Sequence, residues 1–347
     1  MKRFMLLLLS LTFLSSAAAA DDALPWKNKQ ITMIIGFAAG GGTDSAGRLI
    51  ARFLGKYLPG QPTFIVRNQP GADGITALNY MMQQTKPDGL YVAMGSSSQV
   101  DPLHYRAAKA LYDPSQFAFL GGVGRGRSFL LIRTESEPRL NDRTLSPVMM
   151  GSVGVPRSSM QSAAWGIEYL GWNVKWVMGY RGTNEVLLAL SRGEIDMSST
   201  DLSAGSKMLE TGKFKVVAQT GSLDVGRTHM MPEIEHAPIF RDLMSGKIQD
   251  PIARQAFDYW LSFNSVDKWL ALMPDTPSAI VAVYRDAFVK ASADPEFIEL
   301  GTSASEDFSP IDHKVLEDIV RTLAATPPEA IDHLSALLRK QGIDLAH

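Results

Sequence analysis

The chain has 347 residues, of which 45% are apolar and 20% are charged, and its formal net charge is −2. This length favours two domains and supplies enough apolar residues for buried cores. The mild acidity excludes nucleic acid as an expected partner, and the absence of cysteine excludes disulfides, thiolate catalysis and cysteine metal sites.

The first 20 residues have the pattern of a secretory signal peptide. Lys2 and Arg3 form a basic tip, an apolar run extends from Phe4 to Leu14, and an alanine-rich segment ends at Ala20. The apolar run is too short to span a bilayer comfortably. We therefore expect export to the periplasm, with cleavage near Ala20, and a soluble mature protein.

A strand, a glycine turn and a helix follow in series. The nearly all-apolar run Ile31 to Ile35 predicts a buried strand, Gly40 to Gly42 permits a tight turn or a close ligand, and Thr43 or Asp44 can cap a helix. The N–H groups at such a helix start attract anions. Ser45 replaces the third glycine of a dinucleotide fingerprint, which argues against a nucleotide. A carboxylate site and a purely structural turn both remain open.

The next segment repeats this arrangement. We expect strands at 63–66 and 90–94, with a helix at 75–84 between them, and the later strand ends in a serine loop at 95–98. Ligands of open α/β sheets bind outside the carboxyl ends of the strands. Two polar loops on one predicted sheet favour a binding site over a hydroxyl-rich turn.

The second half of the chain contains further strand–loop–helix units. The glycine cluster at 121–126 predicts a crossover between domains. We expect strands at 146–150, 174–178, 215–220 and 269–274, and helices at 159–169, 185–191, 277–291, 310–324 and 328–341. Three prolines interrupt residues 228–262, for which the sequence predicts no clear order of elements.

Several short motifs occur in an order that resembles a known family. They are Ile31 to Asp44, Val66 to Gly74, Lys86 to Leu90, Gly151 to Gly154, Gly179 to Gly182, Gly193 to Asp196, and Pro274 to Pro277. Each is weak alone, but their shared order is similar to that of the extracytoplasmic solute receptors of tripartite tricarboxylate transporters, also called the Bug family.

This resemblance implies a fold, a ligand class and a partner. The implied fold is α/β, a two-domain, type II-like periplasmic-binding-protein (flytrap) fold in which each domain is a mostly parallel sheet flanked by helices. We expect one domain at 21–124 plus 228–347 and the other at 125–227. The implied ligand is a small di-, tri- or aromatic carboxylate, delivered to the membrane permease subunits of a tripartite transporter by a monomeric receptor without cofactors.

Ligand-binding residues are expected on loops of both domains. They are Phe37, Gly41, Gly42, Thr43, Asp44, Ser96, Ser97 and Ser98 in the first domain, and Ser152, Gly154, Arg157, Tyr180, Asp196 and Thr200 in the second. Arg157 departs from the small residues common in the family, and two interpretations stay open for it: a bidentate partner of a distal carboxylate or a solvent-facing residue at the rim. The segment 240–268 is longer than is usual in the family.

An enzyme is the main rival class. The sequence lacks the G-x-S-x-G and H-E-x-x-H motifs, and its six histidines form no pair with metal-ligand spacing. We therefore expect neither a catalytic residue nor a metal site. A sensory adaptor that reports the same ligand to a membrane signalling protein remains an open alternative.

Overall fold

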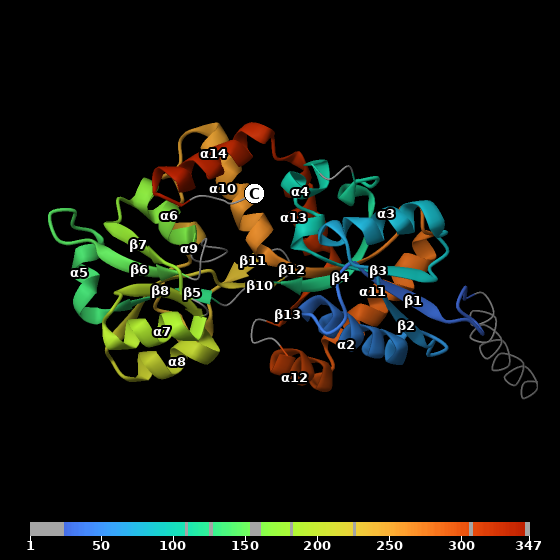
Figure 1. Cartoon of the computed structure of the whole chain (residues 1–347). Coiled ribbons are helices and arrows are strands. Elements are labelled where there is room, and N and C mark those ends of the chain that lie inside the picture. Colours follow the sequence, from blue (N-terminus) through green and yellow to red (C-terminus); the bar gives the residue numbers. More distant parts are fainter. Residues whose placement is uncertain are drawn as a thin grey trace, which may run out of the picture. The chain divides into compact units, whose positions relative to one another are not determined.

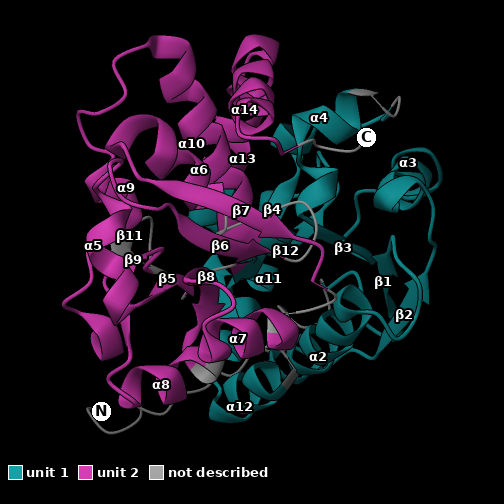
Figure 2. Cartoon of the chain, turned by 60° about the vertical axis from the view of Figure 1, so that its left-hand side comes forward, with its two compact units in different colours: residues 1–123, 267–317 teal, residues 124–266, 318–347 magenta. Residues whose placement is uncertain are grey.

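The computed structural model describes residues 24–107, 110–124, 128–152, 161–180, 183–224, 227–304 and 308–343. The predicted signal peptide at 1–20 lies outside these residues, as do the candidate site residues Gly154 and Arg157. The chain divides into two compact units, unit 1 (1–123 and 267–317) and unit 2 (124–266 and 318–347), which are coloured separately in Figure 2.

Unit 1 contains a six-stranded sheet with the order β13-β4-β12-β3-β1-β2. Its strands are β1 (Ile31–Ile35), β2 (Phe64–Asn68), β3 (Tyr91–Ser96), β4 (Ala118–Gly124), β12 (Val266–Leu272) and β13 (Ser309–Asp312). Its helices are α2 (Gly42–Tyr57), α3 (Ile75–Gln84), α4 (Pro102–Ala107), α11 (Ser278–Ser292), α12 (Pro295–Ala304) and the start of α13 (His313–Ala325). Strand β1 pairs in parallel with β2 and β3, whereas β12 pairs antiparallel with β3.

One core cluster of unit 1 lies on the face of the sheet that α2 and α11 cover. Ile50, Phe53 and Leu54 of α2 are buried there at helical spacing, together with Tyr284 and Phe288 of α11. Burying each such side chain contributes about 1.5–3 kcal/mol. Figure 1 shows α2 on one side of β1 and β3 and α3 on the other.

Unit 2 contains a five-stranded sheet with the order β7-β6-β8-β5-β9 and a small hairpin. Its strands are β5 (Ser128–Arg133), β6 (Val148–Ser152), β7 (Val174–Met178), β8 (Met197–Asp201), β9 (Phe214–Gln219), β10 (Ser222–Asp224) and β11 (Arg227–His229). Its helices are α5 (Glu137–Leu140), α6 (Ser162–Trp165), α7 (Thr183–Arg192), α8 (Leu202–Glu210), α9 (Phe240–Leu243), α10 (Pro251–Ser265) and α14 (Pro328–Lys340). Strand β6 is parallel to β7 and β8, and β5 is antiparallel to β8 and β9.

Two hydrophobic clusters hold unit 2 together. On the side of α7 and α8, Phe129 and Ile195 pack with Val186 and Leu190. On the other side, α10 packs against α14. The Trp165 ring meets the Phe257 ring edge-on, with 5.0 Å between ring centroids, and its centroid lies 6.1 Å from that of Trp260. The second cluster explains why 228–266 and 318–347 belong to unit 2, and so why this unit extends beyond the predicted range 125–227.

The predicted α/β two-domain fold class is confirmed, with sheets that are more mixed than expected. In the unit 1 sheet β12 runs antiparallel to β3, and in the five-stranded sheet of unit 2 β5 runs antiparallel to β8. Most predicted elements occur within a few residues of their expected bounds. The start of the predicted helix 310–324 is instead strand β13, and α13 begins at His313. Among the described residues, the helices all lack the combination of length and apolar character that a membrane span requires.

Candidate functional site

The carboxyl ends of three parallel strands meet at one edge of the unit 1 sheet. Ile35 of β1 lies beside Asn68 of β2 and Met94 of β3. The segments that follow these strands are therefore neighbours, as the sequence predicted. This edge holds the candidate residues Phe37, Gly41, Gly42, Thr43, Asp44 and Ser96 to Ser98.

A hydrogen-bond network around the buried Asp44 carboxylate holds the first loop in place. Asp44 Oδ2 accepts hydrogen bonds from the Gly40 N–H at 2.8 Å and from Arg48 Nε at 3.0 Å. Asn68 Nδ2 donates to Asp44 Oδ1 at 2.9 Å and to the Phe37 carbonyl at 2.9 Å. The side chains at the ends of β2 and α2 thus tie down both sides of the glycine turn.

The same network keeps Asp44 ionised and neutralised. The Arg48 hydrogen bond, followed by those from Gly40 and Asn68, lowers the pKa of the Asp44 carboxyl to about 2. Both Asp44 oxygens therefore accept hydrogen bonds from groups of the chain itself. Arg48 and Asn68 were not among the predicted site residues, although the four-residue spacing of Asp44 and Arg48 on one helix favours such a pair.

The start of α2 is formed by glycines at the surface. Its N-cap residue, Gly41, makes no side-chain capping hydrogen bond, and Gly41 and Gly42 are exposed. Thr43, the next residue, is buried. The first amides of a helix have no partner within the helix, so this turn supplies N–H donors and a positive dipole end.

The serine loop leads into a 3₁₀ turn, Ser97–Gln99, and the Gln99 side chain ties the loop to a neighbouring segment. The Ser96 N–H donates to Gln99 Oε1 at 2.8 Å, and Gln99 Nε2 donates to the Gly74 carbonyl at 3.0 Å. Ser96 and Ser98 place their hydroxyl oxygens 3.0 Å apart, and Ser97 is buried. The loop after β3 is therefore fixed to the segment that follows β2.

A close backbone crossing joins the end of β1 to the segment that follows β2. A Cβ atom on Gly36 would lie 2.4 Å from the Gly74 Cα, so glycine is required where β1 ends. Gly74 itself has a φ of +90°, a left-handed conformation that favours glycine.

Unit 2 places two predicted site residues at the carboxyl ends of its parallel strands. Ser152 ends β6 and is fully buried, and Thr200 lies near the end of β8. The Thr200 hydroxyl is buried without a hydrogen-bond partner among the described residues. Tyr180 is half-buried, and its ring lies beside Gly151 of β6.

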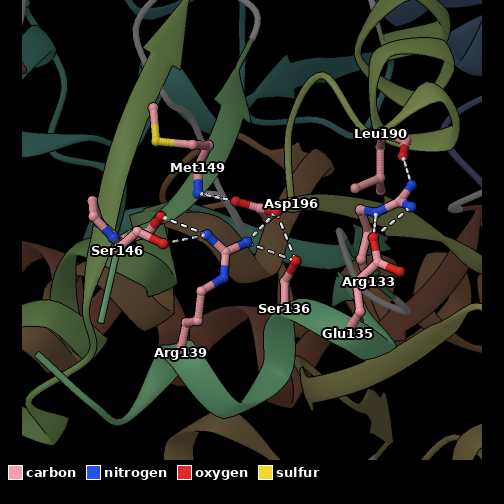
Figure 3. Close-up of polar contacts among 9 residues, drawn as sticks. Arg133, Glu135, Ser136, Arg139, Ser146, Met149, Leu190 and Asp196 are labelled. Atoms are coloured by element: carbon pink, nitrogen blue, oxygen red, sulfur yellow. Dashed lines mark hydrogen bonds and ion pairs between the residues drawn. The ribbon is translucent and has the colours of Figure 1, made fainter. Parts of the chain in front are cut away.

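Asp196 lies at the opposite end of these strands. Its Oδ1 accepts from the Ser136 hydroxyl at 2.7 Å and from the Arg139 guanidinium, and its Oδ2 accepts from the Met149 N–H at 2.8 Å (Figure 3). Since Met149 is near the start of β6, Asp196 is about 10 Å along the sheet from Ser152. The structure does not bring Asp196 together with Ser152 and Thr200, and its carboxylate serves to join α5, β6 and β8.

A hollow of about 470 Å³ lies beside α3. It is lined by Gln69, Thr76, Asn79, Tyr80, Gln83 and Gln84. These side chains are neutral, and the Arg67 guanidinium lies over the Tyr80 ring at 4.9 Å. Over the described ranges, the His, Asp and Glu residues form no group of three that could hold a metal ion.

The two α/β units, with their polar loops at strand ends, define the class of protein. A solved TctC solute-binding protein from Polaromonas has a similar fold, with a TM-score of 0.65 and 19% identity, covering 90% of this chain and 98% of that one. The chain therefore has the fold of a periplasmic solute-binding protein.

The family is narrower than this class. Residues 47–239 match the model of the tripartite tricarboxylate transporter family receptors, TctC, and the chain belongs to this family. A UPF0065 protein of Bordetella pertussis is 27% identical over 323 residues, covering 90% of this chain and 92% of that protein. A UPF0065 protein of Cupriavidus necator is 29% identical over 237 residues, covering 64% and 68% of the two chains. The predicted family is confirmed.

Proposed function

We propose that this receptor captures a small organic carboxylate and delivers it to the membrane permease of a tripartite tricarboxylate transporter. The observation that carries this proposal is the convergence of the glycine-rich start of α2 and the serine loop at one edge of the unit 1 sheet. The Asp44 carboxylate, which would repel an anion, is neutralised there by Arg48.

The proposed contacts in unit 1 are hydrogen-bond donors. They are the amides of Gly41 and Gly42 and the hydroxyl groups of Thr43 and Ser97; the Gly41 amide also donates a long hydrogen bond of 3.4 Å to the Ala38 carbonyl. Amides at a helix start and hydroxyl groups together match the acceptor oxygens of a carboxylate. In unit 2 we propose Ser152, Tyr180 and Thr200 as further contacts, since the buried Thr200 hydroxyl has no protein partner among the described residues and a ligand oxygen would satisfy it.

A thermal-shift panel tests the ligand class. The mature protein is heated with mono-, di-, tri- and aromatic carboxylates, and with sugars and neutral amino acid amides as controls. A ligand that binds only the folded state raises its stability by RT ln(1 + [L]/Kd), so binding is visible without an activity assay. We expect a rise with one class of carboxylate. A response to a neutral control alone would refute the proposed ligand class.

The proposal also specifies the cellular setting. We propose that residues 1–20 direct export and are removed near Ala20, and that the receptor acts as a monomer. Mass spectrometry of the protein from the periplasm and light scattering of the purified protein measure these two properties. A mature chain that retains Met1 or elutes as a stable dimer would contradict them.

A further inference from the structure

A lysine that sequence analysis did not single out lies beside the serine loop. Lys268 of β12 pairs directly opposite Ser96 of β3. Residues that face each other in an antiparallel pair have Cβ atoms about 4.5–5.5 Å apart and point to the same face of the sheet. The pairing of β12 with β3, which are far apart in the sequence, thus brings a cation to the edge where β1, β2 and β3 end.

The face on which Lys268 lies follows from its neighbours. Leu270 and Met94 face each other two positions further along these strands, and both belong to the core cluster that α2 covers. A Cβ atom on Gly47 of α2 would lie 3.2 Å from the Met94 side chain. Because side chains two residues apart share a face, Lys268 and Ser96 lie on the side of α2.

Aromatic packing fixes the position of Lys268. The next residue, Trp269, donates from Nε1 to the Ser96 carbonyl at 2.7 Å and stacks on Phe117 at 5.8 Å between ring centroids. A Cβ atom on Gly122 of β4 would lie 2.4 Å from the Lys268 carbonyl oxygen. The start of β12 is therefore held by β3 on one side and by β4 on the other, and a shift in the register of β12 would break this packing.

The Lys268 ammonium group has capacity for a further partner. Its side chain is 13% exposed, and Nζ donates to Asp267 Oδ1 at 2.7 Å and lies 3.5 Å from the Asp267 carbonyl. An ammonium group carries three N–H donors, so these two contacts leave one. A largely buried cation gains from each further charged acceptor.

We propose that Lys268 binds a carboxylate group of the ligand at this edge, in competition with Asp267 as its internal counter-ion. This inference rests on the proposed carboxylate-receptor function. Lys268 would then discriminate charged acids from their neutral amides, while Asp267 would lower the affinity for all acids.

Two substitutions with opposite expected effects test the proposal. Isothermal titration measures succinate, citrate and benzoate, with succinamide and benzamide as neutral counterparts. We expect Lys268→Gln to weaken binding of the acid that the wild type prefers by about tenfold or more, because a charge-assisted hydrogen bond is lost. We expect Asp267→Asn to tighten binding of that acid several-fold. The amides should respond to neither change.

Lys290 and Asp286 of α11 provide a matched control pair. They form an exposed ion pair at 2.7 Å within the same unit, and Lys290→Gln and Asp286→Asn should leave affinity within about twofold. Acid binding by Lys268→Gln within twofold of the wild type would overturn the inference while the proposed function stands. Failure of the wild type to bind any acid would overturn both. If Lys268→Gln does not fold, as judged by circular dichroism, Asp267→Asn decides: unchanged or weaker binding refutes the competition.

Discussion

The Asn68 side-chain amide donates a hydrogen bond of 2.9 Å to the Asp44 carboxylate. This contact joins the end of β2 to the first turn of α2, and the same amide group also holds the Phe37 carbonyl. A polar pair of this kind fixes a loop that has three consecutive glycines and would otherwise sample many conformations.

Asp44→Asn tests this role through stability. We expect a loss of about 1–3 kcal/mol in the free energy of unfolding at neutral pH, because the charge-assisted bond from Arg48 is weakened. Urea denaturation of the variant and the wild type measures this difference. Asp286→Asn, on the exposed face of α11, is the control and should change stability by less than about 0.5 kcal/mol.

The pH dependence of stability should change in the same variant. The folded-state pKa of Asp44 is about 2, below its ordinary value, so its stabilisation is present above about pH 4 and is lost as pH falls toward 2. Denaturation between pH 5 and 2 should show a shallower slope for Asp44→Asn. Some slope should remain, since hydrogen bonds from Lys56 and then Tyr57 also lower the pKa of Asp294 to about 2. Identical slopes in the two proteins would contradict the network.

Thr43→Ala and Ser97→Ala test the proposed donors. Each removes one hydroxyl group at the carboxyl edge of the unit 1 sheet, and each should weaken binding of the preferred carboxylate by about 0.5–3 kcal/mol. Titration calorimetry measures the change, with Thr322→Ala on α13 as a control whose hydroxyl bonds only within its helix. Wild-type affinity in both variants would remove these residues from the site.

Gly36→Ala tests the backbone crossing at the end of β1. The new methyl group would lie 2.4 Å from the Gly74 Cα, which forces the two loops apart. We expect a loss of about 1–3 kcal/mol in stability, as for overpacked cores. Gly42→Ala is the matched control for stability, because no heavy atom lies within 4 Å of its added Cβ. Thermal melts in which Gly36→Ala is as stable as Gly42→Ala would show that the crossing is not tight.

Asp196→Ala separates a structural role from a ligand role. It removes the acceptor of Ser136, Arg139 and Met149, and should cost about 1–3 kcal/mol of stability without changing carboxylate affinity. Chemical denaturation and titration calorimetry measure the two quantities separately. Glu135→Ala, whose carboxylate is mostly exposed beside Arg133, should be nearly neutral. Weaker binding with unchanged stability would return Asp196 to the ligand-binding set.

Several elements of the candidate site were predictable because their determinants are local. Three elements have the predicted bounds: the strand Ile31–Ile35, the helix Ile75–Gln84 and the strand Val174–Met178. Their hydrophobic patterns are contained in each segment, and glycines directly adjoin their ends. The prolines in 228–262 masked α10, because Pro251 occupies its first turn rather than breaking it.

By itself, the sequence determined the strand–glycine–helix unit at 31–57, the serine loop and the receptor family, because these depend on short segments and their order. Only the tertiary structure decided which residues share an edge. It joined Asn68 to Asp44 and Lys268 to Ser96, which are 24 and 172 positions apart, and placed Asp196 away from Ser152. Strand pairing and register depend on burial across the whole sheet, and no local pattern encodes which distant strand a residue will face.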